Sequence, residues 1–185
     1  MQRLRGPGWR WSGLVAQVLV VGGCLALATG TAAAAQPFSG RMDELFAMSA
    51  CPAGTLATVA CVTVTGTGEL SHLGKTTEAV AATINLAAFS PATNCVPDQA
   101  RAVFTAANGD RLFLTTNGSS CQTGPGTGVD TGRYVITGGT GRFTGASGSG
   151  AYTTNATYAA NMQSGTSITT YSGTISTGHR IGASK

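Results

Sequence analysis

Short apolar runs separated by turn signals follow one another along the chain, and no long helical period interrupts them. Loop signals stand at Ser90-Pro91 and at Gly124-Pro125-Gly126. The runs that we interpret as strands cover residues 38–48, 57–70, 75–86, 101–107, 111–117, 133–137, 143–146, 148–160 and 167–177. About eight or nine strands are enough to close a small barrel, so the pattern predicts an all-β antiparallel barrel.

The dipeptide Asn108-Gly109 is a strong signal for a two-residue hairpin turn between two of these runs. With this dipeptide at the tip, the numbers of opposite residues add up to 217. Alternation then gives one face with Val103, Thr105, Leu112 and Leu114, and a second with Phe104, Ala106, Arg111 and Phe113. Because both faces carry large apolar groups, we expect an oligomer contact or a covering segment here, or else only isolated exposed apolar residues.

The cysteines support a disulfide framework. Once Cys24 is set aside, four remain, an even number that predicts two disulfides in an exported domain. The numbers of Cys95 and Cys121 add up to 216, so these residues lie almost opposite each other at the open end of the hairpin. We predict the bridge Cys95–Cys121 and, by elimination, Cys51–Cys61. A zinc site is the alternative, but the chain has no C-x-x-C pair, and we expect no metal.

Residues 1–35 have the order of a secretory signal. A basic start is followed by an apolar stretch at 14–28 and by small residues that end at Ala35. We therefore expect cleavage after Ala35, a barrel domain at 36–177 and a flexible tail at 178–185. The apolar stretch is shorter than the ~20 residues of a membrane span. Lipidation at Cys24 is the other alternative, because Val21-Gly22-Gly23-Cys24 loosely fits a lipoprotein site.

Charge adds little to the list of partners. The formal charge of +4 falls to +1 when the three arginines of the start are removed, with 8 basic against 7 acidic residues. No basic run remains for nucleic acid or for a membrane surface. The 10% of charged residues and 42% of hydrophobic residues also exclude a disordered chain. We attribute much of the high content of glycine, 27 residues, to turns.

The most specific segment covers residues 134–148 and has the sequence YVITGGTGRFTGASG. We interpret it as a strand, a glycine-rich turn and a second strand, with Phe143 as the single large anchor. A phosphate-binding loop would be followed by a helix and a Lys-Ser/Thr pair, which are missing, so we expect neither a nucleotide nor another cofactor.

This segment resembles the hairpin shared by the allene oxide cyclase and dirigent barrels. In those families a hydrophobic residue precedes Gly-Gly-Thr/Ser-Gly, Phe and a run of small residues. The matching structural positions here are Gly138, Gly139, Gly141 and Phe143. Residues 68–74 similarly resemble a stretch in bacterial secreted relatives.

The resemblance implies a calycin-like, eight-stranded antiparallel barrel with an apolar cavity, often assembled as a trimer. Allene oxide cyclase cyclises an unstable fatty-acid epoxide, and dirigent proteins orient phenoxy radicals during coupling. In both, the shape of the cavity carries much of the outcome. Their catalytic residues are not carried over, because their cavity carboxylates and Asn have no clear match here.

Glu78 is the carboxylate that the pattern singles out. In the run 75–86 it shares a face with the most apolar positions, among them Val80 and Ile84. On a cavity wall it would have a raised pKa and act as an acid or base. The alternative is a strand-end carboxylate that reaches water. Asp98 and Asp130 are assigned to loops, because Pro or Gly lies beside them.

Three further side chains are candidates. Tyr152 and Tyr158 share a strand face and line a ligand cavity, or simply pack across strands. His72 is a conceivable general base, or a turn residue at the surface. We expect a secreted barrel that binds a small apolar molecule in its lumen. The alternatives are a cyclase or isomerase that uses cavity shape and one carboxylate, and a barrel filled by its own side chains with a structural role.

Overall fold

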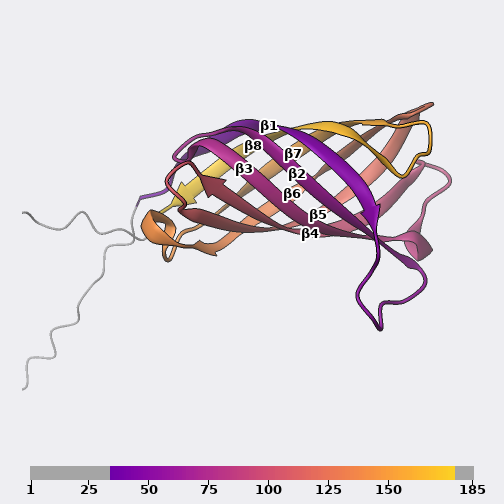
Figure 1. The fold of residues 1–185 in the computed structure, drawn as a ribbon, viewed down its shortest axis with the longest axis horizontal. Helices are drawn as coiled ribbons and strands as arrows, with labels where there is room; N and C mark the ends of the chain where they lie inside the picture. The colour runs from indigo at the N-terminus through magenta and orange to yellow at the C-terminus, as the bar shows by residue number, and fades with distance from the viewer. Residues whose placement is uncertain (1–33, 178–185) are drawn as a thin grey trace, which may run out of the picture. The chain divides into compact units, whose positions relative to one another are not determined.

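The computed structural model describes residues 34–177, which form a closed antiparallel barrel of eight strands in sequence order (Figure 1). The strands are β1 (Gln36–Ser49), β2 (Val59–Leu70), β3 (Gly74–Asn85), β4 (Cys95–Ala106), β5 (Arg111–Gly124), β6 (Thr127–Gly139), β7 (Ser147–Tyr158) and β8 (Ser164–Ser176). Two 3-10 turns, η1 (Leu86–Ala88) and η2 (Gly141–Phe143), lie between strands. Pairing of β1 with β8 closes the barrel, so the predicted fold class is confirmed.

Each strand alternates between the lumen and the outside, as a period of two requires. In β4, for example, Ala102, Phe104 and Ala106 are buried, whereas the residues between them are partly exposed. The barrel has no free sheet edge, which removes the exposed backbone groups that make open sheets prone to aggregation. In a closed barrel, every large side chain on the inner face must therefore pack within the lumen.

The two ends of the barrel differ. The end formed by the β2–β3, β4–β5 and β6–β7 turns, here called the closed end, is filled by large buried side chains: Phe38, Leu70, Phe104, Leu112, Tyr134, Phe143 and Ile175. The opposite end, here called the mouth, is formed by the loops 50–58, 86–94, 125–126 and 159–163. In Figure 1 the two ends lie on the left and on the right of the barrel.

The hairpin of β4 and β5 differs from the expectation by one residue. Its connection is a turn in which the Gly109 N–H donates to the Ala106 carbonyl at 2.8 Å, with Gly109 at φ +87°. This is the arrangement of a longer loop with a left-handed glycine rather than a two-residue turn. Opposite residues therefore add up to 216, and Phe104 pairs with Leu112 rather than Phe113.

The predicted division of the hairpin into faces was therefore wrong, because a shift of one residue moves a whole strand's side chains to the other face. Phe104, Leu112 and Leu114 all point into the lumen and are buried. Val103 and Phe113 form a half-buried cross-strand pair on the outside. The argument for a covering partner on this hairpin then depends on this one pair.

Both disulfides have the predicted pairing. Cys95 and Cys121 are bonded and are directly opposite in the β4–β5 register. Cys51 and Cys61 are bonded as well and join the β1–β2 loop to β2 at the mouth. The corrected register explains why the first bridge forms, since it makes the two cysteines direct neighbours.

The glycine-rich segment between β6 and β7 closes one end of the barrel. Residues 143–146 were predicted to be a strand, which is wrong: η2 ends at Phe143, residues 144–146 lie outside any strand, and β7 starts at Ser147. Phe143 is fully buried in the closed end. Arg142 forms an ion pair with Asp110 at 3.4 Å and donates to the His72 carbonyl at 3.1 Å, which ties three turns together.

Residues 1–33 of the predicted signal peptide lie outside the described residues, as do the alternative lipoprotein site at Cys24 and the tail at 178–185. β1 begins at Gln36, the residue after the predicted cleavage site. Between residues 34 and 177, no helix is long and apolar enough to cross a membrane.

Replacement of Phe143 by Ala tests the role of this segment. We expect Phe143→Ala to lower the free energy of unfolding by about 3–5 kcal/mol, the usual loss for a buried Phe. Urea denaturation with both disulfides intact measures the loss. Val135→Ala, at an exposed position of the adjoining strand, should cost less than about 1 kcal/mol. Equal losses in the two variants would show that Phe143 does not fasten the closed end.

Candidate functional site: an acidic cavity in the lumen

A cavity of about 160 Å³ occupies the half of the lumen that faces the mouth. It extends to Met48 and Met162, which are exposed at the mouth. Most of its wall is apolar, and its polar wall is made by four carboxyl groups, three tyrosines and hydroxyl side chains. A cavity of about 150 Å³ holds a benzene molecule, so this one accommodates a group the size of a single ring.

The predicted acid–base candidate Glu78 and the four side chains predicted to line a ligand site all border this cavity. Glu78, Val80 and Ile84 come from β3, and Tyr152 and Tyr158 come from β7. Glu78 is 4% exposed, so it does not reach bulk water as the alternative interpretation held. Whether these residues bind a ligand stays a prediction, but the structure brings the five together.

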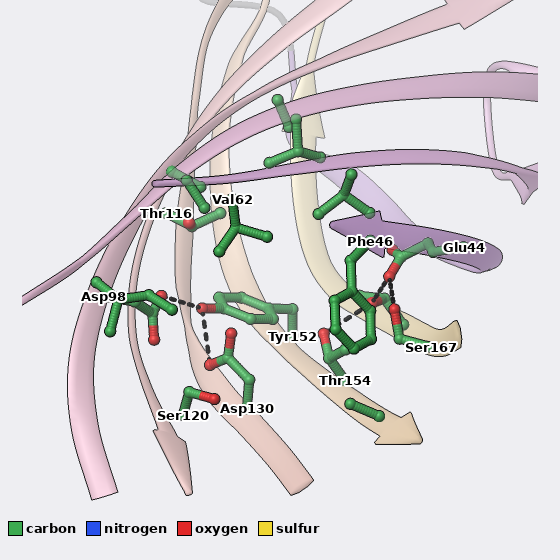
Figure 2. Close-up of a pocket in the computed structure, with 18 of the residues that line it drawn as sticks. Glu44, Phe46, Val62, Asp98, Thr116, Ser120, Asp130, Tyr152, Thr154 and Ser167 are labelled. Atoms are coloured by element: carbon green, nitrogen blue, oxygen red, sulfur yellow. Dashed lines mark hydrogen bonds between the residues drawn. The ribbon is translucent and has the colours of Figure 1, made fainter. Parts of the chain in front are cut away.

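Glu78 meets a second carboxyl group, Glu44 of β1. Glu44 Oε2 accepts hydrogen bonds from the Ser167 hydroxyl at 2.6 Å and the Thr169 hydroxyl at 2.9 Å, both on β8 (Figure 2). The Tyr171 hydroxyl donates to Glu78 Oε1 at 3.1 Å, and Glu78 Oε2 has no hydrogen-bond partner. Both carboxyls are buried, Glu44 being 8% exposed.

A glycine between these two residues lets them approach each other. Gly66 of β2 pairs with Glu44 on one side and with Glu78 on the other. A Cβ atom on Gly66 would lie 2.9 Å from Glu44 Cγ and 3.3 Å from Glu78 Oε2. Glycine within a strand often marks such a close approach, and here it makes room for two acidic side chains.

Burial, followed by the neighbouring Glu44 carboxyl, raises the pKa of Glu78 to about 9, whereas the hydrogen bond from Tyr171 opposes the shift. Two carboxyls in such proximity cannot both ionise at low cost, which favours the protonated form of Glu78. Glu78 is therefore the group that holds a proton at neutral pH, and Glu44 is the acceptor of the hydroxyl donors.

A second acidic cluster lies on another wall. The Tyr152 hydroxyl is 3.2 Å from Asp130 Oδ1 and 3.5 Å from Asp98 Oδ1. Figure 2 shows this hydroxyl between the two carboxyls, with Ser120 beside Asp130. Asp98 is 7% exposed, and its Oδ2 atom has no hydrogen-bond partner.

Two strand glycines give Tyr152 its position. Asp98, Gly118, Gly132 and Tyr152 are consecutive partners across β4, β5, β6 and β7. A Cβ atom on Gly118 would overlap the Tyr152 hydroxyl, and one on Gly132 would lie 2.8 Å from the Tyr152 ring. The tyrosine thus lies flat across two strands and reaches a carboxyl on the third.

Both aspartates are less acidic than in water. Burial raises the pKa of Asp130 to about 7, with a further contribution from the charge of Asp98, against the hydrogen bond from Tyr152. Burial also raises the pKa of Asp98, and its hydrogen bond from Tyr152 again opposes the shift. This cluster therefore changes its charge near neutral pH.

The sequence reasoning missed three of the four carboxyls. Asp98 and Asp130 were assigned to loops, which is wrong, because they lie within β4 and β6. Alternation along the strands could have identified both residues. Asp98 is an even number of positions from Phe104, and Asp130 is an even number of positions from Tyr134, so each aspartate shares the inward face with a large side chain. Glu44 likewise alternates with inward residues of β1. His72, by contrast, lies in the β2–β3 turn at the closed end, where Nε2 is 2.8 Å from the Pro37 carbonyl.

The residues that line the cavity, all between 34 and 177, include no Lys, Arg or His. Within the same described range, no group of three or more His, Cys, Asp and Glu side chains is arranged to hold a metal ion. The wall offers a protonated carboxyl at Glu78, a second pair of carboxyls with raised pKa values at Asp98 and Asp130, and several hydroxyl groups. Such a wall can exchange hydrogen bonds or protons with an enclosed molecule.

Fold and site together define an eight-stranded antiparallel barrel with one filled half and one acidic cavity. No protein-family model matches this chain, and no curated protein matches it in sequence either.

The raised pKa of Glu78 predicts how stability depends on pH. Between about 4.5 and about 9 the folded protein holds a proton on Glu78 that the unfolded chain releases. The free energy of unfolding should therefore fall as the pH rises through this interval. Asp130 contributes up to about pH 7, so the fall from pH 7 to 9 reports on Glu78.

We expect Glu78→Gln to remove most of the fall between pH 7 and pH 9, because an amide has no proton to lose. Urea denaturation at pH 5, 7 and 9 with intact disulfides measures it. Glu69→Gln, at an exposed position of β2, is the matched control and should follow the unsubstituted protein. Parallel curves for Glu78→Gln and the unsubstituted protein would contradict the assignment of the proton to Glu78.

Proposed function

We propose that this protein is a secreted barrel that binds a small, largely apolar molecule in its lumen. The observation that carries the proposal is the cavity of about 160 Å³, lined mostly by apolar side chains, in a barrel whose other half is filled. Concave, mainly apolar pockets with a few directed polar groups are the usual form of small-molecule sites. The four carboxyls and the tyrosines are those polar groups here.

The mouth favours entry of an apolar molecule. The loops 50–58, 86–94, 125–126 and 159–163 contain no Asp, Glu, Lys, Arg or His. They and the adjoining strand end carry exposed apolar side chains: Met48, Leu56, Leu86, Phe89 and Met162. An apolar molecule that approaches this end displaces water from apolar surface and desolvates no charged side chain.

Two features support secretion. The two disulfides are typical of proteins that fold in an oxidising compartment. The sequence at 1–35 has the order of a cleavable signal, and the first strand starts at Gln36. The same proposal includes membership in the allene oxide cyclase and dirigent-like barrels, which depends on the resemblance of residues 134–148. The trimer is proposed on the basis of this resemblance as well.

A second candidate function is a cyclase or isomerase that acts through cavity shape and one carboxyl group. Glu78 favours it, because this side chain lines the cavity and its pKa is raised to about 9. A carboxyl that stays protonated at neutral pH is able to donate a proton or a hydrogen bond to an enclosed substrate. A purely structural role suits the closed half of the barrel better than the half that holds the cavity.

A cavity-filling substitution tests the binding proposal. Ala82 of β3 lines the cavity, and its neighbour Ala81 is exposed on the outside of the same strand. We expect toluene to bind the unsubstituted protein and to raise its Tm. In Ala82→Leu the larger side chain occupies the space, so the affinity should fall by about tenfold or more, a change of roughly 1.4 kcal/mol.

The matched control Ala81→Leu adds the same atoms outside the barrel and should bind toluene as the unsubstituted protein does. Isothermal titration calorimetry and thermal unfolding give the two readouts. Failure of toluene to bind, or equal losses in both variants, would refute a ligand site in the lumen.

A further inference from the structure

The cluster of Asp98, Tyr152 and Asp130 is short of hydrogen-bond donors. A tyrosine hydroxyl has one hydrogen, yet a carboxyl oxygen of each aspartate lies within 3.5 Å of the Tyr152 hydroxyl. That hydrogen can satisfy one of the two contacts at a time. Asp98 Oδ2, buried in the wall of the cavity, has no hydrogen-bond partner at all. Asp98 thus has a spare buried acceptor oxygen, and the single hydroxyl hydrogen between the two carboxyls cannot serve both of them.

The charge of the wall is unbalanced in the same direction. Four carboxyls border the cavity, and the lining residues, all within 34–177, include no basic side chain. Buried carboxylates without a cation are costly unless they take up protons or meet a positive charge. Aromatic rings of Phe46, Tyr152 and Tyr158 also line the cavity, and their faces attract cations.

We propose that the Asp98–Tyr152–Asp130 cluster binds the protonated amine of a small molecule whose apolar body fills the cavity. This inference deepens the proposed function and depends on it. An ammonium group has three N–H donors and one positive charge, which supply the donors and the charge that the cluster lacks. The body that accompanies it is about the size of one ring, as the volume of the cavity requires.

The other acidic pair is a poorer site for the amine. Glu44 Oε2 already accepts two hydroxyl donors, and Glu78 Oε1 accepts one. Glu78 would also have to give up a firmly held proton before it could pair with an ammonium group. At the aspartate cluster an ammonium group displaces fewer hydroxyl donors, because the two aspartates share the Tyr152 hydroxyl and Asp98 Oδ2 has no hydrogen-bond partner. The proton on Asp130 is also released at a lower pH than the proton on Glu78.

The affinity for an amine should then rise with pH. The groups that face Asp130 are Asp98 from β4 and Tyr152 from β7, with the charge of Glu44 from β1 further away. All of them disfavour its ionised form except the Tyr152 hydroxyl, which donates to it. Because the pKa of Asp130 is raised to about 7, the fraction of ionised Asp130 rises about tenfold between pH 6 and pH 8.

The test uses three probes that share one ring: benzylamine, benzyl alcohol and benzoate. Calorimetric titration of the disulfide-bonded protein at pH 6 and pH 8 gives their affinities. We expect benzylamine to bind about tenfold more tightly at pH 8 than at pH 6, a difference of roughly 1.4 kcal/mol. At pH 8 it should also bind about tenfold more tightly than benzyl alcohol does at either pH. Benzoate should bind most weakly, because its charge has the same sign as the wall.

Two isosteric variants locate the site. Asp98→Asn and Asp130→Asn should each weaken benzylamine about tenfold and leave benzyl alcohol within about twofold, the spread usual for an uninvolved site. Asp43→Asn, an exposed carboxylate on the outer face of β1, is the control and should change nothing. The pH series on the unsubstituted protein stands as a test even if the variants fail to fold.

The outcomes separate the two proposals. If benzyl alcohol or benzoate binds at least as tightly as benzylamine, or if neither aspartate variant weakens benzylamine, the amine site is overturned while the binding function stands. If none of the three probes and no toluene binds, the ligand-binding function is wrong and the amine site falls with it.

Discussion

The space inside a closed barrel of eight strands is the constraint on which the rest of this structure depends. A lumen of this size is just wide enough for side chains to fill, so a large inward side chain requires a neighbour without one. Glycines on the inner face provide that space, and the large side chains lie over them: Tyr152 over Gly118 and Gly132, Tyr134 over Gly150 and Gly173, Phe46 over Gly165, and Tyr158 over Gly128. Glycine weakens a strand by itself, but here each one admits a ring or a carboxyl.

The filled half and the cavity are joined through Tyr171. Its ring contacts Phe104 and Tyr134 of the closed end, with centroids 5.4 and 5.9 Å away, and its hydroxyl donates to Glu78. The ring of Tyr152 lies against it as well, at 6.3 Å. Because buried rings pack closely and hold their rotamers, the core of the closed end also fixes the two hydroxyls that serve the acidic groups. Packing and site chemistry therefore belong to one network.

Much of this could be predicted from the sequence, because alternation and turn residues are local signals. The barrel, both disulfides and the inward position of Glu78 follow from them. The β4–β5 register failed by one residue, since Asn108-Gly109 suits more than one loop length. Asp98 and Asp130 were missed because nearby Pro and Gly suggested loops. Contacts across the lumen are beyond such reasoning, since the partners of Glu78 lie on distant strands and only closure of the barrel brings them together.

The four carboxyls of the lumen, three of them buried and Asp130 half-buried, are each stabilised without a basic partner among the cavity-lining residues. A buried carboxyl is tolerated if it pairs with a cation, accepts several donors or takes up a proton. Glu44 follows the second route, Glu78 the third, and the aspartates share one donor between them. The charge of the lumen is therefore not fixed by the protein alone, because it depends on pH and on what the cavity encloses. If the cavity holds the ligand proposed above, the balance of donors and acceptors on its wall contributes to the selection of that ligand together with the shape of the cavity.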